Sequence, residues 1–249
     1  MCSSDLLLHP NVPPQDRPFD QVPDYPVTPL DAPRFVKKMA DQARRAHVAP
    51  DDYLTLLTTV WQRRAEVPAQ ITRIAALARA HKAPMLSHDD SQAETRAYYR
   101  QIGATLAEFP MHDRVIIAAR DAGDSIVLGA PNAMRGGSHL GSPGAALMIA
   151  RGLCDILASD YYYPAMLGAM VRLLADRVAP LPALWKLVSL NPARAMRLAD
   201  RGRIAPGQRA DLLLLDWPEG QAPAPLRTWV SGRPGYSALP FTPYPEPAL

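Results

Sequence analysis

Four short apolar segments of the sequence are each followed by polar residues that can bind a metal ion or transfer a proton. Imidazole and carboxylate groups are common ligands of zinc, and a carboxylate can also accept a proton from water. The residues that follow the four segments are, in chain order, His88 and Asp89, Glu108, Asn132, and Asp160. Four such positions in succession favour a catalytic rim over ordinary loop polarity.

The best candidate for a metal ligand among them is His88. Its neighbour Asp89, with Asp90 behind it, could orient the imidazole or hold a second cation. A structural histidine that is hydrogen-bonded to this aspartate pair is the alternative. Glu108 is a further candidate ligand, and the alternative for that carboxylate is to cap the helix that follows it.

A second kind of site is indicated by the run Arg135-Gly136-Gly137-Ser138-His139. Two glycines let the backbone approach a ligand closely, and their N–H groups can form an anion-binding nest. The arginine adds a bidentate charge for phosphate, and the serine and histidine add hydrogen bonds. The run therefore predicts a phosphate-binding loop, to which Asn132 would also contribute, with a flexible turn as the alternative.

The elements that must position these residues alternate between apolar and helical stretches. Apolar segments begin roughly 20 to 30 residues apart, which is typical of βαβ units in a parallel sheet. The carboxyl ends of parallel strands converge on one ligand site. An irregular helical protein with short buried runs is the alternative. The predicted strands are 84–87, 105–109, 125–128 and 154–158, and the predicted helices between them are 92–102, 112–122 and 144–149.

Composition restricts the class of protein. The chain has 249 residues, of which 48% are apolar, and a formal charge of +3, so a globular protein without a nucleic-acid partner is expected. Its two cysteines have no metal or redox spacing, which favours a reduced, cytoplasmic setting. No membrane association is expected. The proline-rich residues 1–33 predict a poorly ordered leader, and helices are expected from Pro33 to His81.

The stretches Ser189–Ala193 and Gly202–Leu212 resemble the carboxyl-terminal signature of the amidohydrolase superfamily. This resemblance implies an α/β fold, with part of a TIM-like (β/α) barrel over 34–200. Strands of a small β-sandwich would follow over 201–235, and then a loose tail over 236–249.

Further blocks resemble one branch of that superfamily, the metal-dependent diphosphatases of phosphonate catabolism. The resemblance implies hydrolysis of the 5-triphosphate of a ribose phosphonate to the 5-phosphate and diphosphate, with a divalent metal, expected to be zinc. It also implies that Asp160 touches the metal and takes a proton from the attacking water; a helix N-cap is the alternative for this residue. The blocks are 86–90, 107–110, 129–139 and 155–162.

Two other functions stay open. One is a superfamily hydrolase of C–N bonds in cyclic amides, or a deaminase. The other is an inactive remnant, since no two of the six histidines have the His-x-His spacing that the superfamily carries on its first barrel strand. The sequence is therefore expected to represent an amino-terminally incomplete family member. An incomplete sheet exposes an edge that invites association, so a homo-oligomer is possible alongside the small-molecule substrate.

Overall fold

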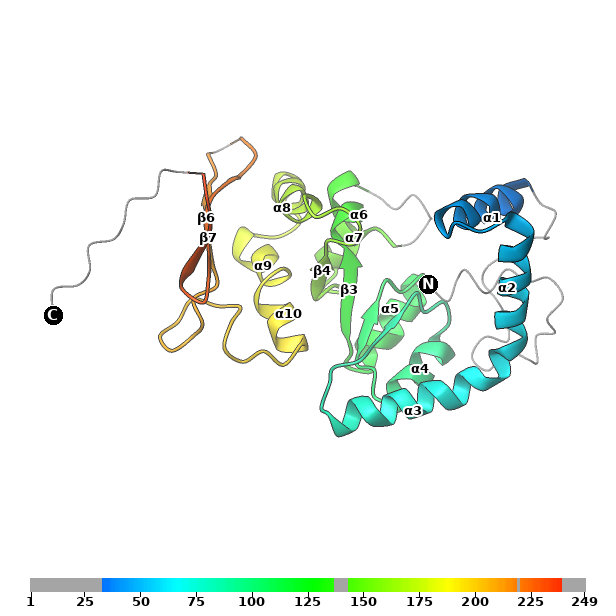
Figure 1. Ribbon diagram of the computed structural model, residues 1–249. Coiled ribbons are helices and arrows are strands. Elements are labelled where there is room, and N and C mark those ends of the chain that lie inside the picture. The colour runs from blue at the N-terminus through cyan, green and yellow to red at the C-terminus, as the bar shows by residue number, and fades with distance from the viewer. Residues whose placement is uncertain (1–32, 137–142, 219, 239–249) are drawn as a thin grey trace. The chain divides into compact units, whose positions relative to one another are not determined.

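The computed structural model describes residues 33–136, 143–218 and 220–238 (Figure 1). The chain divides into two compact units, residues 1–126 and residues 127–249. Most of the predicted leader and most of the predicted tail lie outside the described residues, as do Gly137, Ser138 and His139 of the predicted phosphate loop.

Unit 1 begins with helices that pack through small and apolar side chains. Met39 and Ala43 are one turn apart on the first helix and are buried against Tyr53 of the second. In the third helix, Ile71, Ile74, Leu77 and Ala78 fall on one stripe, which predicts its buried face. Ile74 and Leu77 are exposed, however, and Ala75 is buried instead. The helices are α1 (Pro33–Arg45), α2 (Pro50–Gln62), the 3-10 turn η3 (Arg63–Glu66) and α3 (Val67–Ala80).

Two βα units complete unit 1. The two strands are parallel, and His88 lies opposite Glu108 in their register. Val115, Ile116 and Ala119 form the buried face of the second helix, at the i, i+1 and i+4 positions that one helix face presents. The elements are β1 (Leu86–His88), α4 (Ala93–Gln101), β2 (Leu106–Glu108) and α5 (Asp113–Asp121), each within two residues of its predicted bounds.

Unit 2 continues the same alternation. Its strands β3 and β4 are also parallel, with Gly129 opposite Ala158. The elements are β3 (Ser125–Gly129), which begins at the end of unit 1, α6 (Ala130–Arg135), α7 (Ala145–Ala150), β4 (Ile156–Ala158) and α8 (Ala165–Ala175). Buried side chains from both strands and from α8 form the core, among them Leu128, Leu157, Met170 and Leu173.

The pair Asn191-Pro192 predicts a break between two helices, with Asn191 as the N-cap of the second. Helix α9 (Leu181–Lys186) ends at Lys186 and α10 (Leu190–Ala195) begins at Leu190, so the N-cap is Ser189, two residues earlier than predicted. Asn191 instead donates its side-chain N–H to the backbone carbonyl of Asp155, at 2.8 Å. The asparagine thus ties α10 to the segment that leads into β4.

The end of unit 2 is a three-stranded antiparallel sheet with strand order β5-β6-β7. The strands are β5 (Leu212–Asp216), β6 (Ala224–Val230) and β7 (Arg233–Ser237). Strand β7 was not predicted, because Pro234 and Gly235 disfavour strands; it lies at the sheet edge, where proline is tolerated. The run Leu212–Leu215 by itself predicts a buried strand, whereas Leu213 and Leu214 are 41% and 44% exposed.

These elements confirm the predicted α/β class, with parallel βα units followed by a separate antiparallel sheet. No helix in the described part of the chain is long and apolar enough to cross a membrane.

Gly202, in the superfamily-like signature, occupies a position that no other residue fits. Its φ is +90°, and a Cβ there would lie 2.8 Å from the Cβ of Ala193 and 3.0 Å from the carbonyl oxygen of Ser189. We expect Gly202→Ala to lower the free energy of unfolding by about 2 kcal/mol or more, since backbone strain and a clash add. Gly207 is the matched control, because its φ is +77° and nothing lies within 4 Å of a Cβ there. Equal losses in urea unfolding would show that the clash contributes nothing.

Candidate functional site

Backbone strain marks the carboxyl ends of three strands. Asp89, Phe109 and Asp160 follow β1, β2 and β4 closely, and their φ values are +58°, +52° and +53°. Residues with a side chain rarely adopt this left-handed region, and each costs on the order of 1–3 kcal/mol. Such strain is found most often at functional sites, so the strand ends of both units are the places where a site is expected.

In unit 1, the imidazole of His88 lies between two carboxylates. Its Nδ1 is 3.1 Å from Oδ2 of Asp89, and its Nε2 is 3.9 Å from Oε2 of Glu108. The ring of Phe109 meets the imidazole edge-on, with 5.2 Å between ring centroids. The register that pairs β1 with β2 produces this cluster, since it sets His88 beside Glu108.

The spacing of these donors is close to that of two ligands of one divalent metal. Zinc bonds of about 2.0–2.2 Å at tetrahedral angles put two ligand atoms roughly 3.3–3.6 Å apart, and Nε2 of His88 lies slightly farther than that from Oε2 of Glu108, at 3.9 Å. Asp89 on the opposite ring nitrogen is the usual partner of a metal-binding histidine, because it fixes the tautomer and the ring orientation. The described residues contain no cluster of three or more His, Cys, Asp or Glu side chains that could hold the ion.

The structural alternatives for Glu108 and Asp160 do not account for them. The N-cap of α5 is His112, so Glu108, four residues earlier, is not the N-cap of that helix. The N-cap of α8 is Pro164, also without a side-chain bond, so the exposed Asp160 does not cap α8.

Asp90 takes a different role from the one expected beside His88. Its carboxylate is 2% exposed and accepts hydrogen bonds from the hydroxyl of Ser87 and from the guanidinium of Arg96. Burial raises the pKa of Asp90 above its ordinary value, and the bonds from Ser87 and Arg96 oppose that rise. Asp90 therefore belongs to the core under β1.

Arg96 is the centre of a buried charge network that sequence reasoning missed. Its guanidinium is almost fully buried, with Nη1 3.2 Å from Asp90 Oδ2 and Nε 3.1 Å from Asp124 Oδ2. It also donates to the backbone carbonyls of Ala104 and Leu106. Arg100 forms a second ion pair with Asp124. No sequence signal marks this arginine, because a charged residue on an amphipathic helix is ordinarily solvated.

In unit 2, the predicted phosphate-binding arginine contacts the residue that follows the predicted proton acceptor. The guanidinium of Arg135 is 5.7 Å from the ring centroid of Tyr161, the residue that follows Asp160. A cation over an aromatic face is held by the electrostatic potential of the ring. The tyrosine therefore places a positive charge close to the end of β4.

Two residues near Arg135, Gly136 and Asn132, form hydrogen bonds with the backbone. Gly136 has φ +80° and ends α6, and its N–H donates to the carbonyl of Asn132 at 3.2 Å. That N–H is therefore engaged and does not face a ligand. The side-chain oxygen of Asn132 accepts the N–H of Ala145 at 3.1 Å, which links the starts of α6 and α7.

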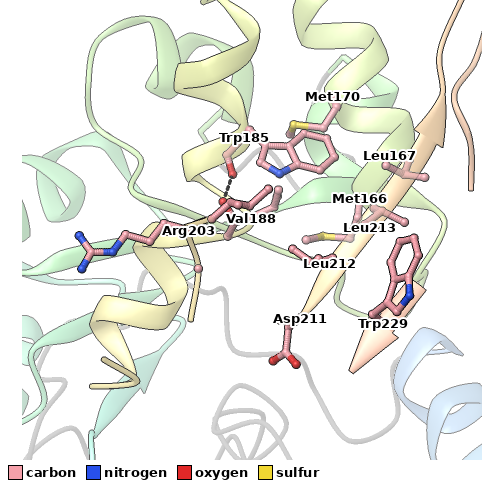
Figure 2. Close-up of a pocket in the computed structure, with 13 residues that line it drawn as sticks. Met166, Leu167, Met170, Trp185, Val188, Arg203, Asp211, Leu212, Leu213 and Trp229 are labelled. Atoms are coloured by element: carbon pink, nitrogen blue, oxygen red, sulfur yellow. Dashed lines mark hydrogen bonds between the residues drawn. The ribbon is translucent and has the colours of Figure 1, made fainter. Parts of the chain in front are cut away.

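A cavity of about 570 Å³ lies elsewhere in unit 2, between the antiparallel sheet and the helices α8 and α9 (Figure 2). Its walls are mainly apolar, and Trp185 and Trp229 contribute the largest side chains. The hydroxyl of Ser189 in the wall donates a hydrogen bond to the backbone carbonyl of Trp185, at 2.7 Å. Among the residues that the structure describes in unit 2, none of the predicted site residues lines this cavity.

Zinc binding provides a direct test of the unit 1 cluster. We expect His88→Ala to weaken zinc binding by more than tenfold, and Asp89→Asn to weaken it about ten- to hundredfold by releasing the ring. Competition with a chromophoric chelator measures both. His81→Ala, an exposed histidine of the same unit, is the control and should change nothing. Unaltered zinc affinity in His88→Ala would exclude this histidine as a ligand.

Comparisons with curated proteins point to hydrolytic enzymes. Over 143 residues the chain is 46% identical to alpha-D-ribose 1-methylphosphonate 5-triphosphate diphosphatase of Escherichia coli K12. The matched segment covers 57% of this chain and 38% of that protein. Over 84 residues the chain is 48% identical to an adenine deaminase of Methylobacterium, covering 32% of this chain and 14% of that protein. The chain thus spans well under half the length of these relatives.

Among solved structures, L-hydantoinase from Arthrobacter aurescens resembles the chain with a TM-score of 0.46 and 15% identity, over 58% of this chain and 47% of that one. The profile of the amidohydrolase family matches residues 30–236, which is most of the sequence and includes every strand-end position described above. On the strength of that match, the chain belongs to the amidohydrolase family.

Proposed function

We propose that this chain takes part in metal-dependent hydrolysis of alpha-D-ribose 1-methylphosphonate 5-triphosphate to the 5-phosphate and diphosphate. The observation that carries the proposal is the placement of Arg135 over Tyr161, directly after Asp160. A positive group and a proton acceptor at one strand end are what phosphoryl transfer to water needs. The 46% identical relative, whose name describes this reaction, supports the choice of substrate.

Each proposed residue has a defined task. Asp160 accepts a proton from the water whose oxygen forms a bond to the α-phosphorus, while the bond from that phosphorus to the bridging oxygen breaks and diphosphate leaves. Arg135 offsets the negative charge on the phosphate oxygens. Asn132 holds the turn that carries Arg135, and Gly137, Ser138 and His139 would extend the grip on phosphate.

The proposed metal ligands of unit 1 are His88 and Glu108, with Asp89 behind the imidazole. In unit 2, Asp160 remains a predicted metal ligand. Amidohydrolases generally use divalent metals, and the nitrogen and oxygen donors here suit zinc. When bound, the ion supplies Lewis-acid activation of water and of a phosphoryl oxygen. In this proposal, the Nδ1–H of His88 donates a hydrogen bond to Asp89, so Nε2 is the nitrogen left to bind the ion.

A second candidate function is deamination of adenine, which the similarity to adenine deaminases favours. Adenine is neutral and makes no demand for an arginine at the strand end. The two reactions are separated by incubating the full chain with zinc and either the ribose triphosphate or adenine. Phosphorus NMR detects released diphosphate, and ultraviolet absorbance detects deamination. Diphosphate release without deamination is expected, and the reverse result would replace the proposal with the second candidate.

A further inference from the structure

A second arginine lies at the turn that follows Arg135. The guanidinium of Arg172, from α8, packs on Gly136: a Cβ at Gly136 would lie 3.5 Å from Nη2, 3.7 Å from Cζ and 3.8 Å from Nη1. These similar distances indicate that the flat face of the guanidinium lies over the glycine. A side chain at position 136 would occupy the space between the turn and the arginine, so the glycine permits their close approach.

The orientation of Arg172 is set from its own helix. Its Nε donates to Oδ2 of Asp176, one turn later, at 2.5 Å. An arginine has five N–H donors, and this bond uses the one on Nε, which leaves the four on the two terminal nitrogens. In the described part of unit 2, no carboxylate pairs with those nitrogens. The side chain is 50% exposed, so a ligand from solvent can reach it.

Arg135 also has a guanidinium that is open to solvent and has no carboxylate partner among the described residues. Within the described ranges its guanidinium contacts the Tyr161 ring and pairs with no carboxylate, and the residue is exposed. Two guanidinium groups from different helices thus flank one turn, and Asp176 is the single carboxylate that the described residues place against either. An arrangement with excess positive charge and unused, preoriented donors suits a ligand with several negative charges.

We propose that Arg172 is a second anion-binding residue, which together with Arg135 grips a polyphosphate group at the Gly136 turn. The inference rests on the proposed function and deepens it, since it makes recognition of a chain of phosphates depend on two arginines. Asp176 is the positioning residue, because it holds the fork of Arg172 in place. A neutral nucleobase would gain nothing from either arginine, so the pair also determines specificity.

Calorimetric titration of the full chain with inorganic tripolyphosphate tests the proposal without any reaction. Arg172→Gln is expected to weaken binding about ten- to hundredfold, the usual effect of losing hydrogen bonds to a charged partner. Arg172→Lys should lie between this variant and the parent chain, because lysine keeps the charge and loses the fork. The matched control is Arg194→Gln, which removes the same charge from an exposed position on α10 and should change the affinity less than twofold.

Three outcomes would overturn the proposal: no binding of tripolyphosphate by the parent chain, unchanged affinity in Arg172→Gln, or an equal loss in Arg194→Gln. A lowered melting temperature with unchanged affinity would assign Arg172 to the packing of α8 on α6 alone. The anion site and the proposed function can fail separately. Arginine-dependent binding with no diphosphate released from the ribose triphosphate would retain this site and reject the diphosphatase.

Discussion

Replacement of Asp160 by asparagine is expected to lower the rate of diphosphate release by roughly 10²–10⁴-fold, the range that a positioned general base contributes. Asparagine keeps the size of the side chain but cannot accept the proton of the attacking water. The loss should appear in kcat, because the proton moves during the reaction and not during binding. Phosphorus NMR of the product under saturating substrate measures it.

The binding of tripolyphosphate provides the second readout for this variant. Asp160 follows β4 immediately before Tyr161, which carries Arg135, so removal of its negative charge should leave affinity for an anion unchanged or slightly raised. Asp200→Asn is the control, since it makes the same chemical change at an exposed aspartate of unit 2. Full activity in Asp160→Asn would exclude it as the base, whatever happens to the affinity.

The second large effect concerns stability. Arg96→Met is expected to lower the free energy of unfolding by about 3–5 kcal/mol, because it leaves the carboxylates of Asp90 and Asp124 buried without their shared cation. Urea unfolding followed by circular dichroism measures the loss. Arg100→Met should have a smaller effect, since Arg100 is 40% exposed and Asp124 keeps Arg96 as a partner. Equal losses in the two variants would contradict a central role for Arg96.

The loss in Arg96→Met should depend on pH. Burial already raises the pKa of Asp90 in the folded chain, and Arg96 opposes that rise. Without Arg96 the folded pKa rises further, while the unfolded pKa stays near 3.8. The folded variant therefore binds a proton more readily than the unfolded chain, and stability falls as pH rises from 3.8 through the raised value. The deficit should be smaller near pH 4 than at pH 7, and the opposite trend would contradict this account of Asp90.

Local pattern was sufficient to predict the βα elements and the residues at their ends. Short apolar runs bounded by polar residues predicted β1 to β4 within two or three residues, because a strand needs only a run of side chains that pack on its faces. The placement of His88, Glu108 and Asp160 at strand ends followed from the same pattern. Strand β7 was missed because Pro234 and Gly235 read locally as a turn, and pairing along β6 outweighs that preference.

The partners of those residues were decided by the tertiary structure. Arg96 and Asp124 are 28 positions apart, and Gly136 and Arg172 are 36 apart, so no local period relates them. Whether an arginine on a helix is solvated, buried with carboxylates or turned toward a glycine depends on which element packs against that helix. The sequence by itself determined which side chains stand at the strand ends, since local spacing along the chain controls that. Packing decided which charges meet, because the free energy of a charge depends on its burial and on partners that the chain brings from far away.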